Sequence, residues 1–379
     1  MSNNTKTIRE PLFHVVKRGK LPVKNSILIR IYAILIALAI SSLLCLIFLK
    51  VNPITMFSSM LKGTFGTSKN TWKLLHELAV LLGVSLAVAP AFKMKFWNCG
   101  ADGQTLVGGL ACAACMHYLS DLPNGILIPI MLIASITAGV IWAVIPAIFK
   151  AFYNTNETLF TLMMNYIAIQ LVLFFTNTWI TNPETGKLVF TKLPLFKVGL
   201  LPQIFNAYLL NILIVTLITV AVYIYLKYTK QGYEVAIVGE SKNTAKYIGI
   251  STKKVIIRTM IISGAICGIM GFLLVAGYNH TIDGNLVKGR GFTAILVTWL
   301  GKVNPLYMIL TSFMVVFLNT GTTYFTDSIK LGNSSFADIL TAIAFFCIIA
   351  CEFFVVYKIK LRKKNKKTIK EKSEVIKND

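Results

Sequence analysis

Few residues in this sequence are spaced for chemistry of their own. Cys112 and Cys115 stand in "GGLACAACMHYL" close to His117, a spacing found in metal and redox sites. No second pair of ligands accompanies them, and both cysteines lie in an apolar run, so we interpret them as small helix-packing side chains. His76 and Glu77 lack the second histidine of a zinc protease. The sequence therefore predicts no catalytic residue and no metal site.

The groups that power active transport directly are also missing. The sequence has no phosphate-binding loop of the form G-x-x-x-x-G-K followed by Ser or Thr, so we expect the chain to hold no cofactor and not to hydrolyse ATP itself. An ion-coupled carrier often needs paired carboxylates inside its spans, but Asp102 and Glu157 fall at the ends of apolar runs. Glu352 lies near the C-terminal lysines, where a snorkelling or paired residue is more typical than a proton relay.

The apolar runs must position any functional residue. The 379 residues are 55% hydrophobic and 14% charged, whereas soluble domains average about 25% charged residues, which indicates an integral membrane protein. Most of these runs reach the roughly 20 residues of a helical span, and they lack the alternation of barrel strands. The runs are Ile27–Leu49, Leu74–Phe92, Thr105–Leu119, Ile126–Phe149, Leu159–Trp179, Ala207–Tyr228, Val255–Ala276 and Ile339–Tyr357.

Two further runs, Gly291–Leu300 and Pro305–Asn319, are short and are separated by "GKVNP", in which proline stops a helix. We interpret them as a broken re-entrant helix pair. The predicted fold is an all-α, polytopic membrane helix bundle of about eight full spans plus this pair, eight to ten segments in all. Gly264, Gly268 and Gly271 are expected to allow close helix contact inside the bundle.

The net charge of +23 gathers before the first run, in a mid-chain loop and in the C-terminal tail. By the positive-inside bias, these regions and both termini are expected on the cytoplasmic side, and this distribution argues against nucleic acid as a partner. We divide the chain into a cytoplasmic basic N-terminal segment (1–26), a transmembrane domain (27–357) containing a polar loop (229–254), and a cytoplasmic basic tail (358–379).

Within that loop, "GYEVAIVGESKNTAKYIGI" (232–250) predicts a helix of two turns. Ser241 or Asn243 could cap its start, Ala245 and Ile248 lie three apart, and Gly249 is a typical stop. Such a helix is too short to be stable alone in water. Either it enters a groove on a partner protein, or the segment is a solvated loop lying on its own bundle.

The same segment resembles the cytoplasmic coupling segment of permease subunits in bacterial ABC importers of the ribose, nucleoside and branched-chain amino acid type. The family pattern runs V-G-x-N-x-x-A-A-R-Y-x-G-I, and Thr244 and Lys246 stand here at an Ala and the Arg position. The matching residues are Val238, Gly239, Asn243, Ala245, Tyr247, Gly249 and Ile250.

Three other stretches agree in the same order. "FWNCGADGQTLVGG" is similar to the family's F-N-I-G-A-E-G-Q, and "IWAVIPAIFKAFYNTNETLFTLMMNYIA" resembles the version of its motif associated with nucleoside importers. "GRGFTAILVTWLGKVNP" looks like G-x-G-F-x-x-I-x-V-A-L-L-G-x-x-N-P, with Thr298 and Trp299 at the Ala and Leu positions. The likeness runs from about Phe92 to Gly321.

The resemblance implies a permease subunit in a bacterial cytoplasmic membrane, closest to nucleoside (simple-sugar-type) permeases. It implies a second permease subunit, identical or different, an extracellular substrate-binding lipoprotein, and ABC ATPase subunits that bind the ATP. The expected contacts with the ATPases are Gly239, Glu240, Asn243, Ala245, Tyr247 and Gly249.

Polar residues near the ends or breaks of spans are the candidates for a substrate pathway, namely Asn98, Gln104, Asn165, Thr298, Trp299 and Asn304. Structural roles remain open for several of them. Asn98 and Gln104 could satisfy backbone groups of a glycine-rich turn, and Asn165 could bond a neighbouring helix. Trp299 could stack weakly on a nucleobase or simply pack.

Other functions are compatible with parts of the sequence. Within the same family, the substrate could be a simple sugar such as ribose or galactose, or a branched-chain amino acid. From other classes, an ion-coupled secondary transporter is a weaker alternative, since neither mid-membrane carboxylate pairs nor clear inverted repeats are found. A thiol oxidoreductase using Cys112 and Cys115 is weaker still, because both cysteines are interpreted as packing residues.

Overall fold

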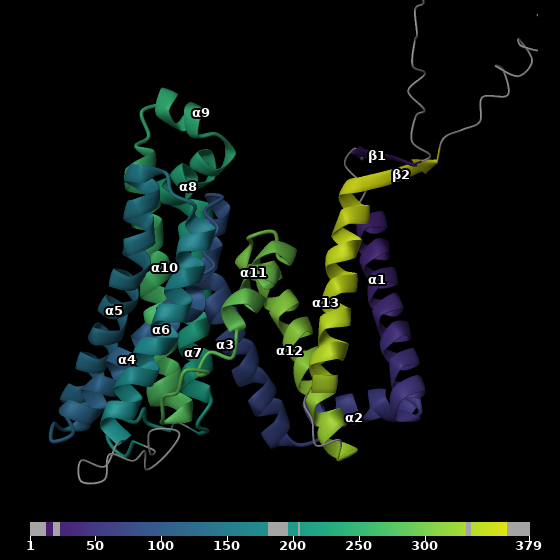
Figure 1. Cartoon of the computed structure of the whole chain (residues 1–379), viewed down its shortest axis with the longest axis horizontal. Helices are drawn as coiled ribbons and strands as arrows, with labels where there is room; N and C mark the ends of the chain where they lie inside the picture. Colours follow the sequence, from purple (N-terminus) through teal and green to yellow (C-terminus); the bar gives the residue numbers. More distant parts are fainter. Residues whose placement is uncertain (1–12, 18–22, 181–195, 204, 331–334, 362–379) are drawn as a thin grey trace, which may run out of the picture. The chain divides into compact units, whose positions relative to one another are not determined.

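The computed structural model describes residues 13–17, 23–180, 196–203, 205–330 and 335–361 (Figure 1). They fall into two compact units, the first formed by Met1–Ser59 with Thr322–Asp379 and the second by Met60–Gly321. Most of the predicted N-terminal segment (1–26) and most of the predicted tail (358–379) lie outside the described residues. The division into units separates the two ends of the chain from its middle.

The first unit pairs the first helix of the chain with its last. Helix α1 (Val23–Leu44) continues into a π-helical turn, η1 (Cys45–Leu49), and packs along α13 (Ser335–Val356). Strands β1 (Phe13–Lys17) and β2 (Tyr357–Leu361) form an antiparallel pair with Phe13 opposite Leu361. These strands are a correction to the all-α prediction, because five residues give too short an alternating pattern to stand out beside long apolar runs.

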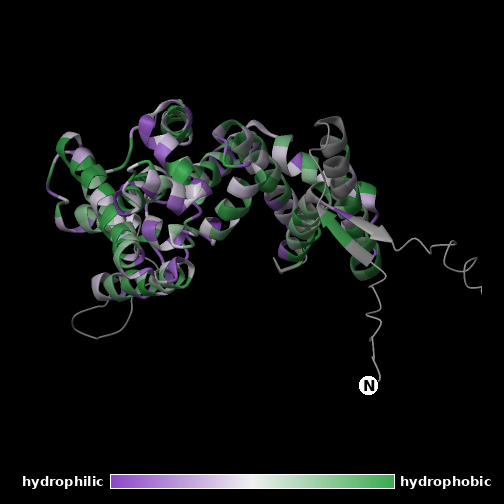
Figure 2. Cartoon of the chain, turned by 90° about the horizontal axis from the view of Figure 1, so that it is seen from above, coloured by the Kyte–Doolittle hydropathy of each residue, from purple (hydrophilic) through white to green (hydrophobic). Residues whose placement is uncertain are grey.

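The second unit holds most of the helices, and Figure 2 shows many hydrophobic residues along the helices of the chain. Its elements are α3 (Ser68–Lys93), α4 (Ala101–Tyr118), α5 (Asn124–Tyr153), α6 (Glu157–Ile180), α7 (Leu209–Tyr228), α8 (Lys230–Glu240), α9 (Lys242–Tyr247), α10 (Thr252–Leu274), η2 (Val275–Asn279) and α11 (Arg290–Leu300). Two more helices, α2 (Pro53–Phe65) and α12 (Pro305–Ser328), run from one unit into the other.

Helix α10 is the centre of the second unit. It packs against α3, α4 and α5, and α3 packs in turn against α7 and α11. Side chains are buried along most of α3 and α10, whereas α5, α6 and α7 expose large apolar residues such as Ile133, Phe174 and Leu217. An apolar exposed face is what lipid contact requires.

Small residues allow the central helices to touch, as the sequence predicts for Gly264, Gly268 and Gly271. A methyl group placed on Gly268 would lie 2.3 Å from the Ser135 carbonyl oxygen of α5. The same addition at Gly271 would lie 2.3 Å from the Thr105 carbonyl oxygen of α4. The contact between α10 and its neighbours is therefore backbone against backbone, which is typical of membrane helix pairs.

The helical membrane bundle is confirmed, but the expected eight full spans are not. Among the described residues, α3, α5, α6, α7, α10 with η2, and α12 are long and apolar enough to cross a membrane. A seventh span results if Leu35–Leu49 and Pro53–Phe65, which meet at 110°, count as one. The run Thr105–Leu119 lies in α4, whose polar residues lower its hydropathy. The cytoplasmic placement of both termini stays a prediction.

The broken helix pair needs a correction in its second arm. Helix α11 is short, as expected, and ends before the break at Gly301, but α12 has 24 residues and is a candidate span. The polar residues after Asn319 do not end the helix, because they bond within it. Thr326 Oγ1 donates to the Thr323 carbonyl and Ser328 Oγ to the Phe325 carbonyl, at 2.8 and 2.7 Å.

We predict that Gly268→Ala loosens the contact between α10 and α5. The added methyl group has no room beside the Ser135 carbonyl, and overpacking of this kind costs about 1–3 kcal/mol. The measurement is the thermal midpoint of the purified protein in detergent. Gly125→Ala is the matched control, since nothing lies within 4 Å of that position. An equal midpoint for both variants would contradict the close contact.

Candidate functional site

The predicted coupling loop 229–254 is largely helical. The Thr229 hydroxyl accepts a hydrogen bond from the Gly232 amide at 3.0 Å and caps α8, which the sequence did not predict as a helix. Ser241 ends α8 and starts α9, and its hydroxyl accepts from the Thr244 amide at 3.2 Å. Of the two expected caps, the structure uses Ser241. Gly249 follows with a φ of +80°, the left-handed geometry of a helix stop.

These two short helices lie beyond one end of the long helices of their unit (Figure 1). The approach of α8 to α3 is close, because a methyl group on Gly239 would lie 2.1 Å from the Lys93 carbonyl oxygen. Ala245 of α9 is fully buried. An ion pair of 2.9 Å between Glu234 and Arg258 ties α8 to α10.

A single apolar cluster, which we call the elbow cluster, lies beneath α8 and α9. It consists of Ala91, Met94, Phe96, Ala143, Ala147, Val235, Val238, Ala245, Val255, Ile256 and Met260. Its members come from α3, the segment after α3, α5, α8, α9 and α10. Helix α9 has only six residues and would not be stable alone, so this burial is what holds it in place.

The outer side of α9 is free of such contacts. Asn243, Tyr247 and Gly249 are exposed, and Tyr247 has 93% of its surface accessible. Glu240, at the end of α8, is exposed as well. Of the six residues expected to contact the ATPases, four are therefore exposed. The other two, Gly239 and Ala245, are buried and pack α8 and α9 against the bundle. An exposed tyrosine beside apolar surface is typical of a protein interface.

The first three pathway candidates meet in one buried hydrogen-bond network. Gln104 Nε2 donates to Asn98 Oδ1 at 3.1 Å, and Asn98 Nδ2 donates to the Ser263 hydroxyl at 3.1 Å. Asn165 Nδ2 donates to the Cys99 carbonyl at 2.7 Å, while its Oδ1 accepts from the Gly103 amide at 2.8 Å. The network joins the segment before α4 to α6 and α10.

These bonds correspond to the structural roles considered for the same residues. Asn98, Gln104 and Asn165 are no more than 5% exposed, and their amides satisfy backbone groups or one another. The irregular segment 94–100 needs such partners, because an unpaired backbone group in a bilayer costs several kcal/mol, by an order-of-magnitude estimate. A role for the three residues in the pathway stays a prediction.

Two carboxylates fix the start of α11. Arg290 forms an ion pair with Glu77 of α3, and the Gly291 amide donates to Asp102 Oδ1 at 2.8 Å. Sequence analysis placed Asp102 only at the end of an apolar run and gave Glu77 no partner. Because the two bonds join positions 213 and 189 residues apart in the chain, no local pattern could have indicated them.

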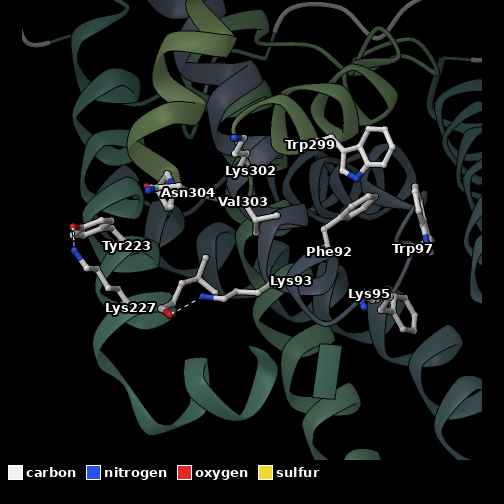
Figure 3. A pocket seen from close by; sticks show the side chains of 13 residues that line it. Phe92, Lys93, Lys95, Trp97, Tyr223, Lys227, Trp299, Lys302, Val303 and Asn304 are labelled. Carbon is white, nitrogen blue, oxygen red and sulfur yellow. Dashed lines mark hydrogen bonds between the residues drawn. The ribbon is translucent and has the colours of Figure 1, made fainter. Parts of the chain in front are cut away.

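The other three pathway candidates lie where α11 ends and α12 begins. Thr298 is buried, with its hydroxyl donating to the Ala294 carbonyl at 2.7 Å. Trp299 and Asn304 instead line a pocket of about 610 Å3 (Figure 3). Trp299 has 58% of its surface accessible and lies 6.2 Å from Trp97, between ring centroids. Of the six candidates, these two reach an open cavity.

Lysines of this pocket were not predicted as site residues. Lys93, Lys95, Lys227 and Lys302 all line it. Lys227 stands beside the mid-chain loop, whose charge sequence analysis interpreted as a topology signal, whereas Lys93, Lys95 and Lys302 were given no role. A second signal was available, because Trp97 and Lys302 lie within the stretches that resemble the permease motifs and Lys95 directly precedes one of them.

Comparisons with known proteins agree with these motifs. A family model described as "Branched-chain amino acid transport system / permease component" matches residues 70–349. The chain is 28% identical over 302 residues to the guanosine ABC transporter permease protein NupP of Bacillus subtilis (strain 168), covering 78% of this chain and 86% of that protein. No solved structure matches the chain.

Two further relatives differ in what their names say they transport. The nucleoside ABC transporter permease protein NupB of Lactococcus lactis subsp. cremoris (strain MG1363) is 24% identical over 306 residues, 78% of this chain and 84% of that protein. The glucose ABC transporter permease protein TsgB13 of Haloferax volcanii is 26% identical over 343 residues, 87% of this chain and 88% of that protein.

We predict that Asn165→Ala destabilises the fold. The Gly103 amide and the Cys99 carbonyl lose their partner, and an unpaired buried group of this kind costs about 1–3 kcal/mol. The measurement is again the thermal midpoint in detergent. Gln170→Ala, at an exposed position of the same helix, is the control and should leave the midpoint unchanged. A stable Asn165→Ala protein would mean that the network does not hold segment 94–100.

Proposed function

The chain belongs to the family of branched-chain amino acid transport system permease components, and from that membership we propose that it is the membrane-spanning permease subunit of an ATP-driven importer of nucleosides. The observation that carries the substrate class is the likeness to two nucleoside permeases over 78% of the chain. The proposed location is a bacterial cytoplasmic membrane, which the six candidate spans support.

The proposed complex supplies what this chain lacks. Two ABC ATPase subunits would bind and hydrolyse ATP, an extracellular lipoprotein would deliver the substrate, and a second permease subunit, identical or different, would complete the pore. No nucleic acid takes part. The exposed side of α9, with Tyr247 at 93% exposure, is the proposed contact with the ATPases.

The elbow cluster supports a mechanical role for α8 and α9. A displacement of these helices is resisted on one side by the contact of Gly239 with the end of α3 and on another by the ion pair of Glu234 with Arg258. Closely packed helices move as rigid bodies, so a displacement of α9 would displace α3 and α10 as well. ATP must bind more tightly to one gate state than to the other for the push to have any effect.

A sugar importer is the second candidate. The glucose permease of Haloferax volcanii matches over a larger share of the chain than either nucleoside permease, at an intermediate identity. The permease family as a whole therefore does not distinguish the two substrates. The nucleoside version of the motif in 141–168 favours nucleosides.

The decisive experiment is reconstitution. We expect proteoliposomes with the permease, its ATPases and its lipoprotein to accumulate radiolabelled guanosine or uridine against a gradient when ATP is present inside, and glucose not to be accumulated. The permease alone is the control and should accumulate neither. Accumulation by the permease alone would overturn the proposal of an ATP-driven importer, and accumulation of glucose only would overturn the substrate class.

A second prediction concerns the outer side of α9. Tyr247→Glu places a charge at the proposed ATPase contact without touching the elbow cluster, so we expect substrate uptake to fall at least tenfold while the thermal midpoint of the isolated subunit stays unchanged. Leu217→Ala, at a position of α7 that is 73% exposed, is the control and should transport normally. Full uptake by Tyr247→Glu would remove this residue from the interface.

A further inference from the structure

The pocket at the break between α11 and α12 combines two kinds of side chain. Its walls come from the end of α3 and the segment after it, the end of α7, and residues 299–305 (Figure 3). Aromatic rings gather on one side, with Phe92, Trp97 and Trp299, and Tyr223 and Lys227 lie on the other. Its volume of about 610 Å3 falls in the range of small-molecule sites.

The charge in the pocket is of one sign. Four lysines line it, and none of the described residues lining it is acidic. Lys93 Nζ donates to the Leu226 carbonyl at 2.9 Å and Lys227 Nζ to the Tyr223 hydroxyl at 2.8 Å, so these two are held in place. Lys95 and Lys302 are exposed, and among the described residues neither has an ion-pair partner. Such a pocket attracts an anion.

The aromatic side of the pocket favours a planar ring. Phe92 and Trp97 meet edge to face at 5.1 Å, and Trp97 lies 6.2 Å from the half-exposed Trp299. Exposed indole faces stack on nucleobases of any kind, because every base has a π face. An occupant that satisfies both sides of the pocket carries an aromatic ring and a negative charge.

The backbone around the pocket is held in an uncommon conformation. Lys95, Lys302 and Val303 all have positive φ, at 58°, 51° and 56°. For a β-branched residue such as Val303 this conformation is strained, and strain of this kind gathers at ligand sites. Two of the three strained residues are the lysines that have no ion-pair partner among the described residues.

We propose that this pocket binds a nucleoside monophosphate and that its occupancy opposes import. The proposal rests on the nucleoside-importer function, because it makes the occupant the phosphorylated form of the transported solute. A neutral nucleoside would gain nothing from four lysines, whereas a phosphate group is bound by clustered cations and the base by the indole rings. Occupancy of the pocket would rise with the concentration of the phosphorylated product on the side of the membrane where α8 and α9 lie.

One segment connects the pocket to the coupling helices. Phe96 lines the pocket and also belongs to the elbow cluster. Lys93 lines the pocket with its side chain, while its carbonyl oxygen faces Gly239 of α8. A ligand packed on residues 92–97 therefore acts on the same segment that carries α8 and α9. It would favour the gate state in which the pocket is open and so oppose the other state.

Binding is tested on the assembled transporter in phosphatidylcholine nanodiscs, with the ATPase sites filled by ADP. We expect saturable binding of radiolabelled guanosine monophosphate, weakened at least tenfold by Lys302→Gln and by Trp299→Ala. Lys69→Gln, at an exposed lysine at the other end of α3, is the matched control and should bind normally. Guanosine and inorganic phosphate should each compete at least tenfold more weakly than the monophosphate.

Three results of that binding experiment would overturn the proposal. They are no saturable binding, binding that Lys302→Gln leaves unchanged, and binding that phosphatidylglycerol in the nanodisc abolishes. The last would identify a lipid phosphate as the occupant.

A transport assay distinguishes failure of this proposal from failure of the proposed importer function. Guanosine monophosphate inside the proteoliposomes should lower ATP-driven guanosine uptake at least fivefold, relative to each variant's own rate without it, and the Lys302→Gln variant should lose that inhibition. An uptake rate that the internal monophosphate leaves unchanged would contradict this inference without contradicting the proposed importer function. Absence of any ATP-driven uptake of guanosine or uridine would contradict the proposed nucleoside importer, while the binding measurement would still decide whether the pocket binds the nucleotide.

Discussion

The approach of α8 to the carboxyl end of α3 is the contact on which the placement of α8 and α9 depends. At Gly239 there is room for a hydrogen atom and little more, because the Lys93 carbonyl oxygen occupies the place of a side chain. Val235 and Val238 of α8 belong to the same buried cluster as Met94 and Phe96, and the single methyl group of Ala245 is also part of it. A six-residue helix that would not be stable alone in water is thereby held against the bundle.

A second constraint comes from the bilayer, in which irregular backbone needs internal partners. Segment 94–100 is not helical, yet the Asn98 side chain accepts from the Gly100 amide and the Asn165 side chain donates to the Cys99 carbonyl. Gln104 bonds the Asn98 side chain and so helps to hold it in position. The same logic explains the connection between α5 and α6. Lys150 pairs with Glu157 at 2.7 Å and also donates to the Thr155 carbonyl at 3.0 Å. The two charged residues of the motif in 141–168 therefore stabilise the turn between α5 and α6.

Local features of the sequence predicted more of this structure than distant ones did. Ser241 as a cap, Gly249 as a stop and the glycines of α10 follow from rules that act within a few residues, and all are present. The extent of α12 was misjudged, because hydroxyls that bond to their own helix look in a sequence like the polar end of a span. Pairings such as that of Arg290 with Glu77, and the meeting of Lys95 with Lys302, depend on the tertiary fold and leave no local pattern.

The pairing of α1 with α13 has a consequence for biosynthesis. A ribosome delivers α1 first and α13 last among the described helices, so the earliest helix must wait in the bilayer while nearly all of the polypeptide is translated. The central helices, whose neighbours lie closer in the chain, can assemble during that interval. The strand pair β1 and β2 can form only after α13 has been made, since β2 follows α13.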